Sequence, residues 1–197
     1  TGTVRWLGIV PDAPSATRTL QWRSPDELLA ITLPAGALPY DVRAMRPQAA
    51  SPARWASAAR GEAAVTVVGS GAYLNARPQA SPKRLSRISA RTGEAVTLAK
   101  GDFVDLELSA STRQLAIVEA AEDIRLVAGR PVQGPYGVAV RRMRLRLLDL
   151  DTGALHRPCQ ACDIRTSLLG WSPARDDLLA YVRADETPWS GGRLIRV

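Results

Sequence analysis

One phrase recurs along this chain, and the recurrence limits the possible folds more than any single residue does. Residues 171–182 read WSPARDDLLAYV, residues 22–32 read WRSPDELLAIT and residues 108–118 read LSASTRQLAIV. A fainter copy, WASAARGEAAVTVV, occupies residues 55–68. One alanine marks each copy, namely Ala30, Ala64, Ala116 and Ala180. Because one copy of such a unit cannot bury its apolar face alone, the sequence predicts a stack of similar units.

The internal order of each copy indicates β-structure. A strand ends in Trp or Leu, a polar turn follows, and a short apolar strand such as residues 178–182 comes next. Proline presets φ at the first turn position, while Asp and Ser side chains bond to their own backbone. The apolar run does not alternate with polar residues, which is typical of a strand covered on both faces, and it is too short for a helix.

A second phrase lies between the copies of the first. RLSRISARTGEAVTL, residues 84–98, matches RLRLLDLDTGALHRP, residues 144–158, so that the pair Thr92 and Gly93 aligns with Thr152 and Gly153. Glycine supplies the positive φ of a tight hairpin, so each copy predicts two strands joined by a turn. RLIRV, residues 193–197, begins a third copy that the chain does not complete, and the chain starts without methionine. We therefore expect a piece of a longer protein.

Together these phrases predict an all-β fold of antiparallel strands, without an amphipathic helix. Repeats of about four strands favour a β-propeller, with blades of ~40–50 residues. The 197 residues would supply roughly four blades, which is an incomplete propeller. We assign residues 1–197 to this single partial domain, with repeat strands near residues 20–33, 55–68, 84–120, 143–182 and 193–197.

The charge of the chain raises the question of a nucleic-acid partner. A net charge of +7 is compatible with one, and the densest basic group is Arg142, Arg144 and Arg146. These arginines share one face of a strand, and Met143, Leu145 and Leu147 share the other. Aromatic residues are not interleaved with the arginines, so the stacking platform of a single-strand binder is missing. We interpret the arginines as the solvated face of an outer strand and expect no nucleic-acid partner. No run is long and apolar enough for a membrane span.

Two cysteines, Cys159 and Cys162, follow the single histidine, His156. A metal site would use these three residues and Asp163, but structural zinc sites usually draw four ligands from two separated pairs. A thioredoxin-like pair needs a βαβ unit beside it. A disulfide in an exported protein and two free thiols in a cytosolic protein both remain open. We expect no metal ion and no cofactor, and we name Cys159 and Cys162 as the possible disulfide of a periplasmic or secreted protein, with a cytoplasmic location as the alternative.

No residue of the chain is expected to be catalytic. A Gly-x-Ser-x-Gly elbow does not occur, and the segment GSGAY at residues 69–73 has the wrong order. His156 follows a Thr-Gly turn, where a solvated side chain is the simpler interpretation. Glu119, Glu122 and Asp123 follow an apolar strand and could bind a cationic group, but they fit a solvated strand end better.

The alternation of the two phrases resembles the amino-terminal β-propeller of the prolyl oligopeptidase family of serine peptidases. It is also similar to the propeller of Tol-type periplasmic proteins. The best matching segments are residues 84–120 and 143–197, with residues 20–33 as a third. The resemblance implies that an α/β-hydrolase domain, absent from this chain, holds the catalytic Ser, Asp and His, while the propeller caps the active site and admits short peptides. No position here matches the catalytic motif. Some members hold a substrate's amino group with an acidic pair on the propeller, a pattern that Glu119 and Glu122 do not reproduce.

Two function hypotheses follow. The first is a non-catalytic propeller segment that gates access of short peptides to the downstream hydrolase domain of a bacterial serine peptidase. The alternative is a stand-alone propeller of the bacterial envelope that binds a protein partner. In both cases the function would lie in loops at one end of the blades, and residues 133–137 and 186–192 are candidates because they are rich in Gly, Pro and aromatic residues. Trp22 and Trp171 are expected to pack between blades. Open blade edges would favour self-association.

Overall fold

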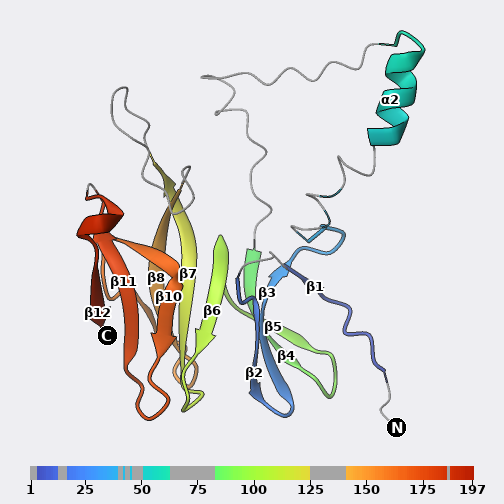
Figure 1. Cartoon of the computed structure of the whole chain (residues 1–197). Coiled ribbons are helices and arrows are strands. Elements are labelled where there is room, and N and C mark those ends of the chain that lie inside the picture. The colour runs from blue at the N-terminus through green and yellow to red at the C-terminus, as the bar shows by residue number, and fades with distance from the viewer. Residues whose placement is uncertain are drawn as a thin grey trace.

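The protein is mostly β-structure in a computed structural model that describes residues 4–12, 17–39, 42, 45, 51–62, 83–124, 141–185 and 187–197. The described strands form three antiparallel sheets (Figure 1). The first sheet contains β1 (Val10–Pro11), β2 (Leu20–Ser24), β3 (Glu27–Leu33), β4 (Lys83–Ser89) and β5 (Ala95–Gly101). The second contains β6 (Phe103–Leu108), β7 (Gln114–Asp123), β8 (Arg141–Asp149) and β9 (Leu155–His156). The third contains β10 (Cys162–Trp171), β11 (Leu178–Ala184) and β12 (Arg193–Arg196).

From β2 onward, strand order within each sheet follows chain order, and β1 is an additional strand beside β3. The second sheet runs β6-β7-β8-β9 and the third runs β10-β11-β12. In the first sheet, β2 pairs with β3 over Glu27–Ala30, and β1 pairs with β3 farther along, at Thr32 and Leu33. On the other side β3 pairs with β4, and β4 pairs with β5. From β2 onward each sheet is therefore a set of antiparallel neighbours, as the repeated phrases predict.

The strand register confirms the repeat and corrects one detail of its alignment. Three pairs lie directly opposite each other at the same place in the three sheets: Trp22 with Leu28, Leu108 with Leu115, and Trp171 with Leu178. Ala30 and Ala180 each come two residues after the leucine of their pair, whereas Ala116 comes directly after Leu115. The alanine of the copy at residues 108–118 is thus misaligned by one residue. The other two copies have two successive leucines before the alanine, whereas Ala116 is preceded by Gln114 and Leu115.

The two Thr-Gly turns are hairpin turns, as the sequence predicts. Gly93 has φ 79° and Gly153 has φ 74°, both in the left-handed region that glycine tolerates best. Each glycine N–H donates 2.8 Å to a carbonyl four residues earlier, on Ser89 and Asp149. In the second turn, the backbone N–H of Thr152 also donates to the Asp149 carboxylate at 2.8 Å and lowers the pKa of Asp149. The residues after each turn form β5 and β9, and residues 193–196 form β12 in the third-strand position.

Two apolar cores lie between the sheets. The core between the first and second sheets includes Leu29, Leu85, Phe103, Leu106 and Leu115. The core between the second and third sheets includes Ala116, Leu145, Ile164, Leu178 and Ala180. A smaller group on the outer face of the first sheet joins Leu28, Ala30 and Ile88 to two residues of the amino-terminal segment, Leu7 and Ile9. Since β3 and β7 contribute side chains to both of their faces, they are covered on both sides, which explains their unbroken apolar runs.

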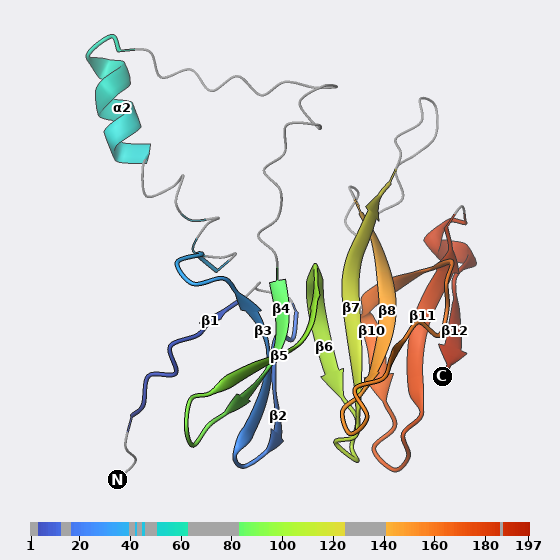
Figure 2. The same cartoon turned by 180° about the vertical axis from the view of Figure 1, so that it is seen from behind.

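The strands that begin the repeat in the three sheets, β2, β6 and β10, lie next to one another. Gln21 on β2 donates to the carbonyl of Leu106 and accepts from the N–H of Leu108, both on β6. The indole N–H of Trp171 on β10 donates 2.8 Å to the carbonyl of Glu107, also on β6. Figure 2 shows the same succession from behind, with the first, second and third sheets side by side.

The prediction of a strand copy at residues 55–68 is wrong for its first part, as is the prediction that no helix occurs. Residues 55–59 belong to α2 (Ser51–Ala59). Alanine has the highest helix propensity, and its frequency in this segment favours a helix over a strand that needs β-branched residues. Residues 63–68 lie outside the described part of the chain. The described strands thus form an open series of three sheets where the sequence predicted roughly four units.

Candidate functional site

A chain of six alternating charges joins the second sheet to the third at the end where β7 finishes and β8 begins. Its members are, in order of contact, Arg183, Asp163, Arg142, Asp185, Arg144 and Glu122. Arg183 binds Asp163 through its Nη2 at 2.8 Å and its Nε at 3.0 Å. Arg142 lies 3.6 Å from Asp163 and 3.7 Å from Asp185. We call this group the ion chain.

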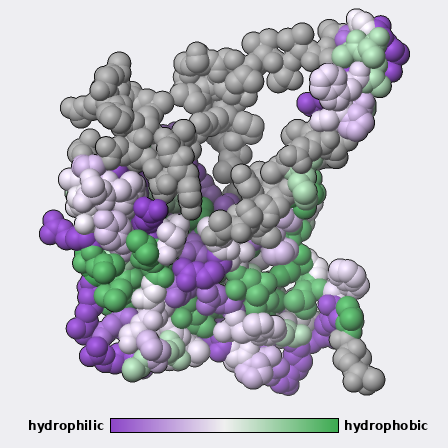
Figure 3. All heavy atoms as spheres, viewed as in Figure 1, coloured by the Kyte–Doolittle hydropathy of each residue, from purple (hydrophilic) through white to green (hydrophobic). Residues whose placement is uncertain are grey.

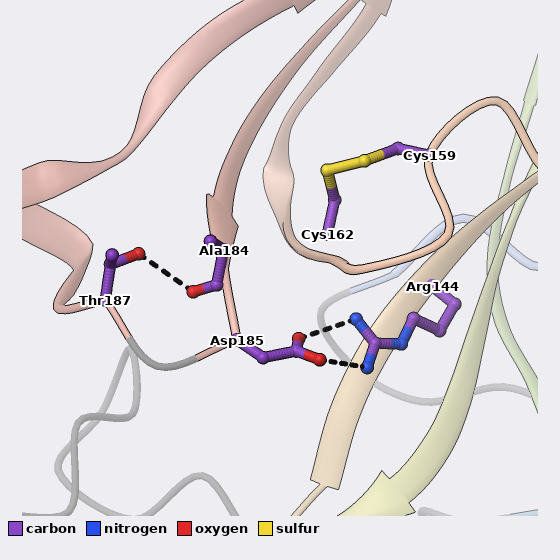
Figure 4. Close-up of a disulfide and its surroundings, with 6 residues drawn as sticks. All are labelled: Arg144, Cys159, Cys162, Ala184, Asp185 and Thr187. Carbon is purple, nitrogen blue, oxygen red and sulfur yellow. Dashed lines mark hydrogen bonds and ion pairs between the residues drawn. A yellow bond between two sulfur atoms is a disulfide. The ribbon is translucent and has the colours of Figure 1, made fainter.

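Arg144 contacts two carboxylates of the ion chain. Its two terminal nitrogens reach the two carboxylate oxygens of Asp185 at 2.7 and 2.9 Å, as a bidentate pair (Figure 4). It also binds Glu122. The hydrogen bonds to Asp185 raise the pKa of Arg144 although burial opposes this, and the hydrogen bond from Arg144 lowers the pKa of Glu122. Every arginine of the ion chain faces a carboxylate, so the group is electrically balanced and acts as a clamp between the two sheets.

The interpretation of Arg142, Arg144 and Arg146 as a solvated face is therefore wrong. Arg142 and Arg144 are buried, and Arg146 binds Glu119 at 2.6 Å. Arg142 and Arg144 are out of solvent and Arg146 is partly buried, because carboxylates from neighbouring strands and from the third sheet neutralise them. Each of these three arginines is thus paired with at least one carboxylate.

The three acidic residues in the second half of β7 have different environments. Glu119 is buried and holds Arg146 and, at 3.4 Å, Arg157, so the prediction of a solvated side chain is wrong for it. Glu122 belongs to the ion chain. Asp123 is exposed and lies 3.8 Å from Arg141, as expected for a strand end. Glu119 and Glu122 are both occupied by arginines of their own chain.

A second polar group lies at the start of β4. The ammonium group of Lys83 contacts Asp12 at 2.9 Å, Asp102 at 3.4 Å and the carbonyl of Phe103 at 2.9 Å. Asp102 also binds Arg141. Asp12 is almost fully buried, and one of its carboxylate oxygens has no hydrogen-bond partner among the described residues. Lys83 thus ties the amino-terminal segment and the β5–β6 connection to the first sheet.

The cysteine pair lies beside the ion chain. Cys159 and Cys162 are joined by a disulfide at the start of β10 (Figure 4). Asp163, the next residue, points its carboxylate to Arg183 and accepts 2.9 Å from the backbone N–H of Met143. His156 is exposed on β9. Of the four residues considered for a metal site, the two cysteines are bonded to each other, Asp163 binds an arginine and His156 lies in solvent. No group of three metal-ligating side chains is found among the described residues.

Of the two candidate loops, residues 133–137 lie outside the described part of the chain, as does Glu186. Residues 189–191 form a short 3-10 helix. The ring of Trp189 lies 4.4 Å from the guanidinium carbon of Arg183, and its carbonyl accepts 2.7 Å from the hydroxyl of Tyr181. This loop is packed on its own sheet and supports the arginine at one end of the ion chain.

The two repeated tryptophans differ in their surroundings. Trp171 packs against the core between the second and third sheets, as predicted. Trp22, at the same repeat position, is 57% exposed, so the prediction that it packs between sheets is wrong for the described chain. The reason is that β2 belongs to the first sheet of the series, and no described sheet precedes it. The described helices include none that is both long and apolar enough to cross a membrane.

Sequence reasoning missed the ion chain as a unit. It noted four of the six members separately, as a strand face, a strand end and a metal candidate, and it did not consider Arg183 and Asp185. The available signal was the position of Asp163 and Arg183 within apolar strands, where a charge requires a partner.

Comparisons with known proteins add a distant structural similarity. The sequence matches no family model and no curated protein. A crystal structure of an uncharacterized protein, lmo1340 from Listeria monocytogenes EGD-e, is similar to 95% of this chain with 9% sequence identity and a TM-score of 0.42. The chain spans 39% of the length of that protein.

Proposed function

We propose that this chain is a segment of a β-propeller, with the three sheets as consecutive blades. The observation that carries the proposal is the succession of first strands: β2, β6 and β10 lie side by side, and each sheet packs a face against the next. A propeller places the first strands of its blades around an axis and packs the blades face to face. The strand order within each sheet and the two Thr-Gly hairpins agree with this architecture.

Within that architecture, the proposed role is a non-catalytic wall. The segment caps the active site of a separate α/β-hydrolase domain in the parent protein and admits short peptides. The support is the resemblance of the repeated phrases to the propeller of the prolyl oligopeptidase family, together with rigid construction. Two apolar cores lie between the sheets, and the partly buried ion chain joins the second sheet to the third. A rigid wall can exclude folded proteins and bulk water from a chamber.

The test uses the intact parent protein and a fluorophosphonate probe that reacts with an activated serine. The proposal expects labelling of one serine outside residues 1–197, within a Gly-x-Ser-x-Gly sequence. Heat-denatured protein is the control, because an activated serine loses its reactivity on unfolding. A parent protein that is not labelled and hydrolyses no short peptide would exclude the peptidase role.

The second candidate is a stand-alone envelope propeller that binds a protein partner. One observation favours it: large apolar side chains, among them Trp22 and Leu194, are exposed on the two outer sheets. Exposed apolar side chains that gather on one face mark interaction surfaces. An unlabelled parent protein that is retained by an envelope protein would select this candidate.

A further inference from the structure

The face of the third sheet that points away from the second sheet carries large apolar side chains in solvent. Leu179 on β11 is 48% exposed and Leu194 on β12 is 63% exposed. Both belong to one face, because Leu194 lies opposite Tyr181 and side chains alternate along β11. Figure 3 shows apolar side chains gathered over β11 and β12, and a second apolar area over the first sheet. We call the first of these the open face of the third sheet.

The same positions are covered in the other two sheets. The register makes Leu179 equivalent to Leu29 in the first sheet and Ala116 in the second, since each follows the leucine opposite the repeated Trp or Leu. Leu29 and Ala116 are both fully buried. By the same register Leu194 is equivalent to Leu85 and Leu145, which are 0% and 1% exposed. The first and second sheets each receive the next sheet on this face. On the third sheet the loop of residues 189–191 covers the face at Tyr181 and Arg183, and no described sheet covers Leu179 or Leu194.

The complementary half of such an interface is present on the first sheet. In the interface between the second and third sheets, Trp171 donates its indole N–H to Glu107 of the preceding first strand. Trp22 is the equivalent of Trp171, and it is exposed beside Leu20, which is 48% exposed. The equivalent of Glu107 on the third sheet is Gly170, because Glu107 directly precedes Leu108 and Gly170 directly precedes Trp171, the residues at the repeated position.

We propose that, in the 197-residue chain, the open face of the third sheet binds the first sheet of a second copy, head to tail, at the place that the proposed propeller gives to a neighbouring blade. The argument is continuity: one chain carries both halves of an interface that it already forms twice within itself. In the complex, Trp22 of one copy donates to the carbonyl of Gly170 on the other, as Trp171 does to Glu107. Such a heterologous contact closes into a ring or extends into a chain of copies, depending on the rotation between them.

The amino-terminal segment competes with this binding. Leu7 and Ile9 pack on Leu28 and Ala30, and Leu28 is equivalent to Leu115, which contacts the preceding sheet in the core. The backbone of residues 4–9 makes no hydrogen bond to the described part of the chain. The segment is therefore held by side-chain contacts, and a second copy would displace it.

Sedimentation velocity of the 197-residue chain over a series of concentrations tests the proposal. The wild-type chain is expected to associate, while Leu194→Glu and Trp22→Glu each remain monomeric. Leu155→Glu, at an exposed leucine of β9, is the matched control and should associate as the wild type does. Circular dichroism and urea unfolding of each variant show that the fold is retained.

Mixing the two defective variants gives the sharpest result. Leu194→Glu keeps an intact first sheet and Trp22→Glu keeps an intact third sheet, so an equimolar mixture should form a pair of one copy each. Association of Trp22→Glu alone would indicate a symmetric contact between two third sheets and would overturn the head-to-tail arrangement. A monomeric wild-type chain would refute the second copy as the occupant of the open face.

Removal of residues 1–9 provides an independent check. Without the competing segment, association is expected to tighten by about tenfold, which is about 1.4 kcal/mol. Leu194→Glu should also abolish association of the shortened chain. Association that survives this substitution would instead come from non-specific contacts of the uncovered first sheet. Unchanged or weaker association of the shortened chain counts against the proposal. These outcomes are independent of probe labelling in the parent protein, so the two proposals can fail separately.

Discussion

Removing Asp163 should destabilise the protein more than removing any exposed carboxylate. Asp163 is buried and holds Arg183 through two contacts, at 2.8 and 3.0 Å, and Arg142 at 3.6 Å. Both arginines are largely buried. In Asp163→Ala they lose a shared counter-charge, and the N–H of Met143 loses its acceptor.

The expected cost is about 3–5 kcal/mol, the usual effect of breaking a buried ion pair by removing one partner. That is a large share of the ~5–15 kcal/mol by which domains are stable, and it corresponds to a fall in Tm of about 10 °C. Urea unfolding followed by tryptophan fluorescence measures it, provided that the slope of the transition equals that of the wild-type chain.

The matched control is Asp26→Ala. The side chains of Asp26 and Arg91 form a 2.7 Å ion pair, but they are 60% and 75% exposed, so the loss should stay below about 1 kcal/mol. If both variants lose the same amount of unfolding free energy, below about 1 kcal/mol, then burial does not make the ion pairs of the ion chain more stabilising than an exposed pair. The double variant Asp163→Ala/Arg183→Met should lose less than the sum of its single changes, because it removes an unpaired charge.

Three further predictions concern single features. Gly153→Ala places a side chain at φ 74° and should cost about 1–2 kcal/mol in the free energy of unfolding; a loss no larger than that of an alanine substitution at an exposed strand position would contradict the turn geometry. Arg144 lowers the pKa of Glu122, so the stabilisation from this pair is complete above the usual glutamate pKa of about 4.3 and is lost as the pH falls through the lower folded pKa. In Glu122→Gln the wild-type decline in stability over that acidic range should be smaller, and an identical pH profile would exclude the pair as its cause. The disulfide predicts that unreduced, denatured protein takes up no alkylating reagent at Cys159 or Cys162, whereas reduced protein takes up two equivalents, as intact-mass measurement would show.

The sequence predicted the β-structure best where a local signal was repeated. Trp22, Leu108 and Trp171 occupy the same register position, and the glycines of the two Thr-Gly turns adopt the expected positive φ. These features depend on residues a few positions apart, which a repeated phrase displays directly. The helix α2 was missed because residues 55–59 were aligned with the start of the repeated phrase, although a segment rich in alanine without β-branched residues favours a helix.

The ion chain could not be predicted from the pattern because its partners are distant in the sequence. Arg144 on β8 meets Asp185, which follows β11, and its burial depends on how the third sheet packs on the second. An arginine in an alternating strand has the same local pattern whether its face meets water or a carboxylate. The exposure of Trp22 has a similar cause, since the repeat fixes its position in the sheet but not whether another sheet precedes it.

The long connection within the first sheet sets the order in which the strands can be completed. β3 and β4 are paired neighbours, yet residues 34–82 separate them, whereas short turns join β6 to β7 and β10 to β11. Closing the longer loop costs more chain entropy. During synthesis, β3 must wait until residue 89 has left the ribosome before it gains that partner. Throughout that interval a strand with six buried positions has β1 and β2 on one edge only, and its other edge is open to pairing with another chain.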